Sequence, residues 1–344
     1  MKKIFSKTFL LLLVVFGACR QENISPNPSN ASTKLLASET GVTQTSLLNT
    51  AWTKKANFAA RLRTGSFAFA LEKQSLGFIG GGFSYINNTS TYYNDLWQYN
   101  PSTDVWTQMA NMPGPGRADA VAFVIGNKTS VAYVGTGHTN ISFASSDFYR
   151  YDVSTNTWQV RASLPIALTV ASGFSIGIKG YIGIGDTNVG LNSTFWEYDQ
   201  VADSWNQKAD FGGGLRNQAI VFSVSGTGYI GGGLDNNSVT RQDFWAYDQG
   251  TDKWSVKNDL PVPGWGTGLA IGSYGYMAVN QQSFWKYFPL TDSWSQAADI
   301  GYSVDVFRSR SAFALNGKGY FGLGAKYVNG QPVYINDFWQ YIPN

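Results

Sequence analysis

Two residue types that carry much of enzyme chemistry occur once each in this chain of 344 residues, as Cys19 and His138. A zinc or copper site built on several histidines is excluded, because one imidazole cannot supply its ligands. A catalytic triad would rest on His138 alone, since Cys19 lies in the apolar N-terminal segment. Glycine runs such as 80–82 follow strand-like segments and open no helix, so they are not phosphate-binding loops. The sequence therefore predicts no metal, no cofactor and no catalytic residues.

The residues that recur most regularly are aromatic. Segment 243–261 reads DFWAYDQGTDKWSVKNDLP, and related copies begin at residues 95, 147, 194 and 283. A sixth copy, DFWQYIPN from residue 337, stops at the C-terminus, and its missing half, AWTKKANF, begins at residue 51. Five copies place a tyrosine seven residues before a tryptophan, as in Tyr247 and Trp254. Such recurrence indicates a packing role, because a single binding or catalytic site would need these residues in one copy only. Between them, Asp252 and its equivalents Asp104, Asp203 and Asp292 favour a tight turn.

Upstream of each copy stands a second recurring pattern, such as GYIGGG from residue 228, preceded by an apolar run such as RNQAIVFSVS from residue 216. Each unit therefore contains four short strands, with glycines where the second strand ends. The composition agrees with this, because aromatic residues make up 15%, charged residues only 14%, and there are 38 glycines. Many short strands and tight turns are expected, with neither long charged helices nor a disordered chain.

This unit resembles the kelch repeat, which has an arginine before its first strand, glycines closing its second, and tyrosine and tryptophan around the last turn. The resemblance implies an all-β, six-bladed kelch-type β-propeller over residues 51–344, with about 49 residues per blade. It also implies that the last blade is closed by an N-terminal outer strand around Trp52, pairing with the C-terminal strand around Trp339. The unit at Met277-Ala278 departs from the glycine pattern, and units three and five lack the arginine.

Function must then reside in residues that differ between blades. On kelch geometry, the loops that frame the central channel carry Arg63, Arg117, Arg216, Arg308, Tyr85, His138, Phe143, Asp186, Asp235, Trp265 and Tyr302. We interpret Arg63, Arg117, Arg216, Arg308, His138, Trp265 and Tyr85 as candidate ligand-binding residues. Arginines beside exposed aromatics suit a carbohydrate with a carboxylate or sulfate. The alternative is that the arginines, as part of the repeat, brace neighbouring loops through backbone carbonyls.

The N-terminus, MKKIFSKTFLLLLVVFGACR, has a basic start and an apolar run too short to span a bilayer as a mature helix. We interpret residues 1–18 as a lipoprotein signal peptide, and residues 19–50 as a lipidated Cys19 followed by a flexible Ser/Thr/Asn-rich tether. This predicts secretion and a lipid anchor in a bacterial cell envelope, at the outer membrane or the periplasmic face. Removing residues 1–18 lowers Lys+Arg from 25 to 22, equal to the 22 acidic residues, so no nucleic-acid partner is indicated.

The sequence favours a non-catalytic, monomeric propeller that binds a glycan or a partner protein at its rim and meets the membrane only through the anchor. Kelch-type propellers also occur in galactose oxidase, whose copper site uses two histidines and a cysteine crosslinked to tyrosine. Because this chain has one histidine and one N-terminal cysteine, a copper-radical oxidase is excluded. The chain also resembles the six-bladed N-acetylneuraminate mutarotase at the level of the fold. The alternative function is therefore a metal-independent mutarotase or epimerase of an acidic sugar, marked by a channel carboxylate of raised pKa beside an arginine.

We expect the substitution Cys19→Ser to remove the lipid, because a serine hydroxyl cannot replace the thiol as the acceptor of a thioether-linked lipid. The protein should then stay unprocessed or move to the soluble fraction, as measured by detergent partition and intact mass. Ser25→Ala, in the same segment, serves as the control. A Cys19→Ser protein that matures and partitions like the wild type would contradict the anchor.

Overall fold

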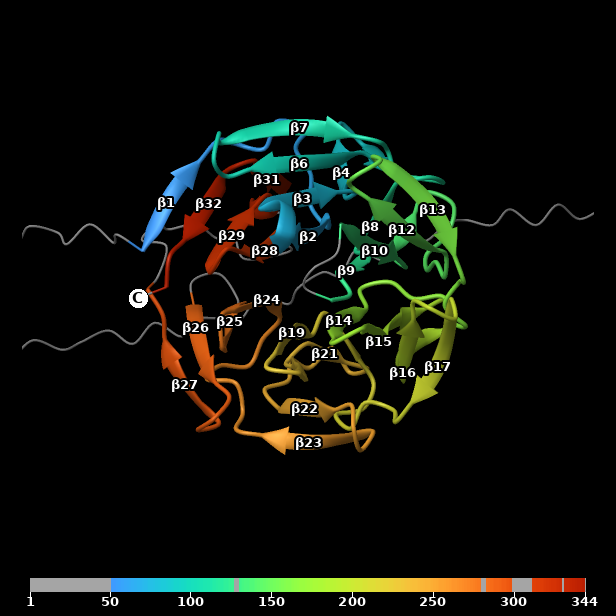
Figure 1. Cartoon of the computed structure of the whole chain (residues 1–344), viewed down its shortest axis with the longest axis vertical. Helices are drawn as coiled ribbons and strands as arrows, with labels where there is room; N and C mark the ends of the chain where they lie inside the picture. Colours follow the sequence, from blue (N-terminus) through green and yellow to red (C-terminus); the bar gives the residue numbers. More distant parts are fainter. Residues whose placement is uncertain (1–50, 127–129, 280–282, 299–310, 330, 344) are drawn as a thin grey trace, which may run out of the picture. The chain divides into compact units, whose positions relative to one another are not determined.

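Each repeat folds into a four-stranded antiparallel sheet, and six such sheets surround a common axis (Figure 1). The computed structural model describes residues 51–126, 130–279, 283–298, 311–329 and 331–343, which all fall in one compact unit of the chain. The six-bladed all-β propeller predicted from the repeats is confirmed. Arg308, Tyr302 and residues 1–50, including Cys19, lie outside the described residues.

The strands of each blade, from the axis outward, follow one order (Figure 1). Blade 1 contains β2 (Phe67–Leu71), β3 (Leu76–Gly80), β6 (Leu96–Asn100) and β7 (Val105–Met109). Blade 2 contains β9 (Val121–Phe123), β10 (Val131–Gly135), β12 (Phe148–Asp152) and β13 (Thr157–Arg161). Blade 3 contains β14 (Ser172–Ile176), β15 (Lys179–Thr187), β16 (Gly190–Asp199) and β17 (Ser204–Lys208). Blade 4 contains β19 (Ile220–Val224), β20 (Thr227–Gly231), β22 (Phe244–Asp248) and β23 (Lys253–Lys257). Blade 5 contains β24 (Gly266–Ile271), β25 (Tyr274–Val279), β26 (Ser283–Phe288) and β27 (Ser293–Gln296). Blade 6 contains β28 (Ser311–Leu315), β29 (Lys318–Gly322), β32 (Phe338–Tyr341) and β1 (Trp52–Lys55).

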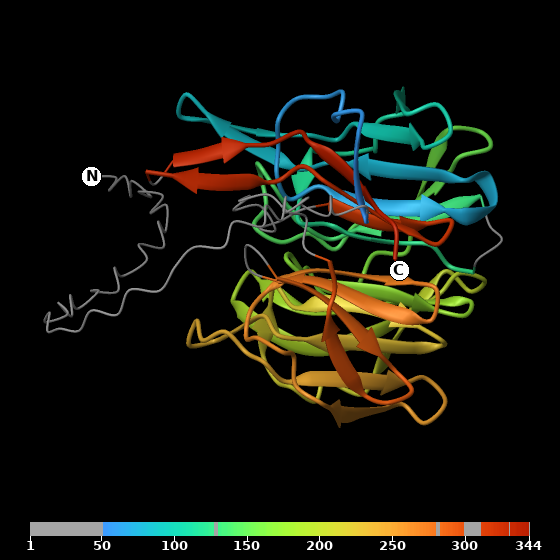
Figure 2. The same ribbon diagram turned by 90° about the vertical axis from the view of Figure 1, so that its left-hand side faces the viewer.

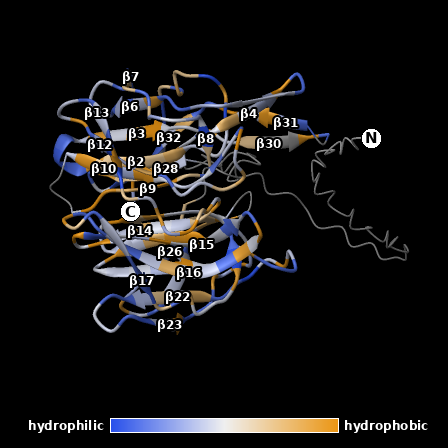
Figure 3. Ribbon diagram, turned by 90° about the vertical axis from the view of Figure 1, so that its right-hand side faces the viewer, coloured by the Kyte–Doolittle hydropathy of each residue, from blue (hydrophilic) through white to orange (hydrophobic). Residues whose placement is uncertain are grey.

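Because strands alternate in direction, the connections between strands two and three lie on the same face as the connections between blades. We call this the mouth face. Short strand pairs extend its loops: β4 (Phe83–Ile86) with β5 (Thr89–Tyr92), β8 (Arg117–Ala118) with β11 (His138–Thr139), β18 (Arg216–Asn217) with β21 (Leu234–Asp235), and β30 (Ala325–Val328) with β31 (Gln331–Tyr334). The hairpins of blades 1 and 6, which contain β4 and β31, project side by side (Figures 2 and 3). The 3-10 turn η1 (Glu72–Gln74) lies between β2 and β3, and the described ranges contain no helix long and apolar enough to cross a membrane.

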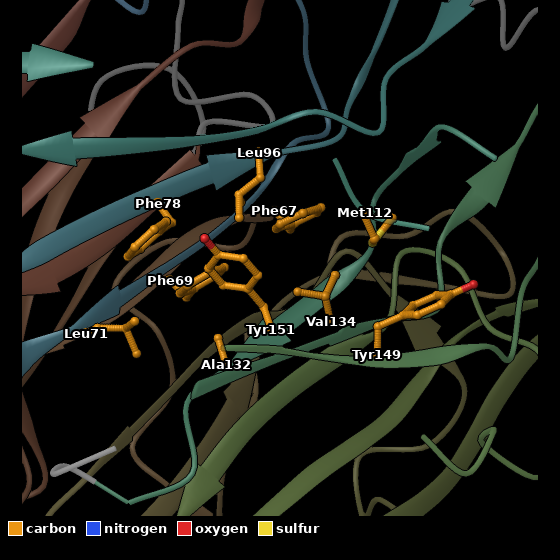
Figure 4. Close-up of a cluster of buried hydrophobic side chains, with 10 residues drawn as sticks. All are labelled: Phe67, Phe69, Leu71, Phe78, Leu96, Met112, Ala132, Val134, Tyr149 and Tyr151. Carbon is orange, nitrogen blue, oxygen red and sulfur yellow. The ribbon is translucent and has the colours of Figure 1, made fainter. Parts of the chain in front are cut away.

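Side chains alternate between the two faces of each sheet, and neighbouring blades pack through the apolar faces that result. In β2 every second side chain is buried, and Phe69 and Phe78 of blade 1 lie against Tyr151 of blade 2 (Figure 4). At the start of strand two, a Cβ on Gly228 would lie 2.2 Å from the ring of Phe174 in the preceding blade. The glycine therefore leaves the space that this phenylalanine fills, which explains its recurrence.

A second contact between blades uses the recurring tyrosine, aspartate and tryptophan, and we call it the blade clasp. Tyr247 Oη donates to Asp252 Oδ1 at 2.8 Å, and the same oxygen accepts the backbone N–H of Ala209 in blade 3 at 3.0 Å. Trp254 Nε1 donates to the carbonyl of Ala209 at 3.0 Å. Burial and the bond to Asp252 raise the pKa of Tyr247, so its hydroxyl stays a donor. Equivalent clasps tie Asp104 to Ala56, Asn156 to Ala110, Asp203 to Ala162, and Asp292 to Asn258.

The N-terminal strand closes the ring as predicted. β1 pairs with β32, with Trp52 opposite Tyr341 and Lys54 opposite Trp339. The indole of Trp52 is 8% exposed, and its Nε1 donates to the carbonyl of Ala298 in blade 5 at 2.7 Å. The last blade therefore uses the first residues of the fold for its clasp.

We expect Trp52→Ala to destabilise the protein by about 3–5 kcal/mol, because it removes a buried indole and a contact across the closure. Urea unfolding followed by circular dichroism measures the effect. Thr53→Ala, on the exposed side of the same strand, should change stability by less than about 0.5 kcal/mol. Equal unfolding free energies for the two variants would contradict closure through β1.

Candidate functional site

The arginine that precedes strand one lies inside the protein. Arg216 is 0% exposed, and its Nη1 and Nη2 donate to the two carboxylate oxygens of Asp243 at 2.8 and 2.9 Å. Nη1 also donates to the carbonyl of Gly232 at 3.1 Å. Burial alone would raise the pKa of Asp243, but the bonds from Arg216 and Trp245 hold that pKa below its ordinary value. The guanidinium thus joins the start of blade 4 to the loops after strand two and before strand three.

Arg63 and Arg117 make the same contacts in blades 1 and 2. They are 1% and 0% exposed and form paired hydrogen bonds with Asp95 and Asp147. Each also donates to a carbonyl of the loop after strand two, Arg63 to Gly81 at 3.0 Å and Arg117 to Thr136 at 3.1 Å. In the described structure these three arginines are buried and paired with carboxylates, the bracing arrangement that the sequence left open as the alternative to ligand binding.

The missing arginines of blades 3 and 5 have a structural explanation. The backbone carbonyl of the brace arginine accepts an N–H from the preceding blade, as that of Arg117 does from Gly82, and in blade 3 the carbonyl of Leu168 takes this place. Blade 3 has Thr194 where blade 4 has Asp243, and blade 5 has Ser283. The arginine and the carboxylate are therefore lost together. Blades 3 and 5 therefore differ from the others by the absence of a pair, not of one side chain.

Of the predicted residues, His138 lies in the most chemically distinctive surroundings. Its side chain is 21% exposed at the mouth face, and its Nδ1 lies 3.3 Å from Asp119 Oδ2 and 3.4 Å from Thr169 Oγ1. Asp119 directly precedes strand one of blade 2 with a left-handed φ of 54°, and its N–H donates to the carbonyl of Gly65 in blade 1 at 2.8 Å. Burial raises the pKa of Asp119, and the positive charge that His138 can carry opposes this shift.

Two aromatic rings of blade 1 form the other side of this site. Tyr92 and Phe83, paired across the β4–β5 hairpin, present edge contacts to the imidazole of His138 at centroid distances of 5.3 and 5.7 Å. Burial and the negative charge of Asp119 raise the pKa of Tyr92. The site thus combines an aromatic wall with an imidazole and a carboxylate.

Polar groups continue around the mouth into blades 3 and 4. The backbone of Thr169 exchanges two hydrogen bonds of 2.9 Å with that of Asp186. Asn217 Nδ2 donates to Asp186 Oδ2 at 2.6 Å. Burial raises the pKa of Asp186, although the bond from Asn217 lowers it in part. We call the set Asp119, His138, Thr169, Asp186 and Asn217 the polar arc.

The other predicted residues are not brought to His138. Tyr85 lies on β4, is 39% exposed, and its N–H donates to Tyr334 Oη of the blade 6 hairpin at 2.6 Å. Trp265 lies half-buried before β24 in blade 5. The carboxylate of Asp235 accepts the N–H groups of Asn237 and Val239 and so closes its own loop. Within the described ranges, no group of three or more His, Cys, Asp or Glu side chains could hold a metal ion.

Asp119 and Tyr92 were not predicted from the sequence, although a signal for Asp119 was present. Two residues after each brace arginine stand Gly65, Asp119 and Gln218, so this position changes from blade to blade while its neighbours repeat. Variation inside a repeat marks a position that packing does not fix. Tyr92 belongs to a loop of another blade, and only the fold brings it to His138.

A comparison with known protein families matches the Kelch motif over residues 79–113. This segment runs from β3 through β7 and so covers the glycine, tyrosine and tryptophan positions of blade 1. Together with the six blades, the match supports a kelch-repeat propeller. No curated protein matches the chain.

We expect Arg216→Leu to destabilise the protein by about 3–5 kcal/mol, because it removes a fully buried guanidinium and leaves the half-buried carboxylate of Asp243 without its cation. Adding Asp243→Thr should restore most of this stability, because blade 4 would then have leucine and threonine where blade 3 has Leu168 and Thr194. There, Thr194 Oγ1 accepts the indole N–H of Trp196 at 3.0 Å, as Asp243 accepts that of Trp245. Urea unfolding of wild type, both single variants and the double variant measures the coupling.

The pH dependence provides the control. Because the folded pKa of Asp243 is lowered, the pair stabilises the wild type above the unfolded pKa of about 4, and this contribution is lost as the pH falls through the folded pKa. The deficit of Arg216→Leu should therefore shrink at acidic pH. Additive single effects would show that Arg216 is not a brace.

Proposed function

We propose that this protein is a non-catalytic binding propeller that takes a saccharide at the mouth of its channel, at the loops of blades 1–4. The binding surface consists of Phe83 and Tyr92 on one side and the polar arc on the other. The lipid anchor at Cys19 belongs to the same proposal and would hold the propeller at a bacterial cell envelope.

One observation carries the proposal: the imidazole of His138 lies between the aromatic edges of blade 1 and the carboxylate of Asp119. A sugar ring has an apolar face of C–H groups and a perimeter of hydroxyls. A binding site for it needs a flat apolar wall and a few oriented acceptors and donors at its edge. The mouth brings two aromatic rings together with an imidazole and several polar groups, and none of these side chains is used in the blade clasp or in the braces.

A second candidate function rests on the raised pKa of Asp119, caused by burial. A carboxylate that holds its proton more strongly, beside an imidazole, is suited to move protons at an anomeric hydroxyl. This would make the protein a metal-independent mutarotase or epimerase of an acidic sugar. The neighbour expected for that activity was an arginine, whereas the contact found here is with histidine. The binding function is therefore preferred.

The test compares wild type with Asp119→Asn and His138→Gln on a glycan array, followed by calorimetric titration of any glycan that binds. Loss of the carboxylate should weaken binding by about 10- to 100-fold, the value of a charge-assisted hydrogen bond. Anomer exchange of the same glycan, followed by NMR, distinguishes the second function, because only an enzyme accelerates it.

Asp248→Asn is the matched control, because it makes the same change on the turn between strands three and four of the opposite face. Burial raises the folded pKa of Asp119, so this group favours folding only below that pKa, and the contribution is lost as the pH rises. Asp119→Asn should therefore keep or raise the melting temperature at neutral pH. Wild-type protein that binds no glycan, or an Asp119→Asn variant that binds like Asp248→Asn, would overturn the proposal.

A further inference from the structure

A cavity of about 480 Å³ opens on blade 1, beside the mouth site. Its lining includes Arg61, Tyr92, Tyr93, Asn94, Trp97 and Gln108. It shares only Tyr92 with the site described above. The volume lies within the range of cavities that hold small organic ligands.

The aromatic walls of this cavity are held rigid. The guanidinium of Arg63 lies 3.9 Å from the ring centroid of Tyr93, and Tyr93 Oη lies 2.8 Å from Ser84 Oγ in a hydrogen bond. The indole N–H of Trp97 donates to Asp95 Oδ2 at 2.8 Å. A ligand would therefore meet flat surfaces that are already oriented, and their ordering would cost little binding free energy.

The charge of the cavity depends on Arg61. Arg63 and Asp95, which also line it, neutralise each other through their paired hydrogen bonds. The side chain of Arg61 is exposed, and within the described part of the chain no acceptor for its guanidinium is present. The cavity therefore carries one positive charge at its edge, next to aromatic surfaces.

This combination is not a product of the repeat. Two residues before the brace arginine stand Arg61 in blade 1, Pro115 in blade 2 and Gly214 in blade 4. Two residues before the brace aspartate stands Tyr93 in blade 1, whereas Arg241 takes this place in blade 4. Because other blades pack with proline, glycine or arginine at these two positions, packing does not require Arg61 and Tyr93 in blade 1.

We propose that the blade 1 cavity is a subsite for an anionic sugar residue, in which Arg61 binds a carboxylate or sulfate and Tyr93 and Trp97 contact the ring. A planar guanidinium can hold either anion through two parallel hydrogen bonds. The inference deepens the proposed saccharide binding at the mouth, and the anion preference expected from the sequence then rests on Arg61 rather than on the buried arginines.

The experiment follows the indole N–H signal of Trp97 in ¹⁵N-labelled protein, identified with Trp97→Phe, during titration with methyl glucuronide or methyl glucoside. We expect the glucuronide to shift this signal and to bind about tenfold more tightly than the glucoside. Arg61→Gln should abolish this preference. Lys54→Gln removes the same charge from the exposed side of β1, and it should keep the preference.

Each result is decisive. A shift at Trp97 that persists in Asp119→Asn supports the subsite even if the mouth site fails. A glucuronide preference unchanged in Arg61→Gln overturns the subsite and leaves the mouth site standing. An equal response to acetate or inorganic sulfate would show anion binding without sugar recognition, and no response at Trp97 to either sugar would equally overturn the proposal.

Discussion

The whole ring depends on one hydrogen-bonding arrangement, in which a turn of each blade holds the backbone of the blade before it. The carboxylate of Asp252 accepts hydrogen bonds from the hydroxyl of Tyr247 in the same blade and from the backbone N–H of Ala209 in blade 3. The indole N–H of Trp254 donates to the carbonyl of Ala209. The left-handed φ of 52° at Asp252 turns its carboxylate to both donors. A single four-stranded sheet would leave its apolar face exposed, and these bonds fix it to the neighbouring sheet that covers that face.

The braces at the mouth face solve a different problem. Irregular loops carry backbone carbonyls without sheet partners, and Arg63, Arg117 and Arg216 supply the donors. The backbone before strand one has the same left-handed conformation in blades 1 to 4, even in blade 3, which lacks the brace, with φ of 66°, 54°, 50° and 53° at Gly65, Asp119, Val170 and Gln218 respectively. The ring therefore imposes this conformation, even on a β-branched valine that disfavours it. Side chains at this position are free to differ, which makes it available for function.

The sequence predicted the blades, their closure and the packing role of the aromatics, because packing rules act on every copy and leave the same residues at the same spacing. It could not decide what the arginines do, because a guanidinium serves a carboxylate of the protein and one of a ligand equally well. The sequence does show that Arg117 occurs together with Asp147 and that both are replaced in blade 3. This joint replacement indicates that the arginine and the aspartate pair with each other. The meeting of His138 with Tyr92 was beyond prediction, because it depends on the course of two loops in different blades.

Asp119 shows where the requirements of fold and function separate. Asparagine adopts a left-handed backbone more readily than most residues, and its amide could still hydrogen-bond His138. A purely structural position would therefore favour a neutral side chain, yet this one carries a carboxylate whose ionisation burial opposes. In the brace of blade 2 and the clasp of blade 4, by contrast, burial alone would raise the pKa of Asp147 and Asp252, but the hydrogen bonds that these carboxylates receive lower it. Under the proposed binding function, a ligand would use this carboxylate of Asp119, which the repeat itself does not require.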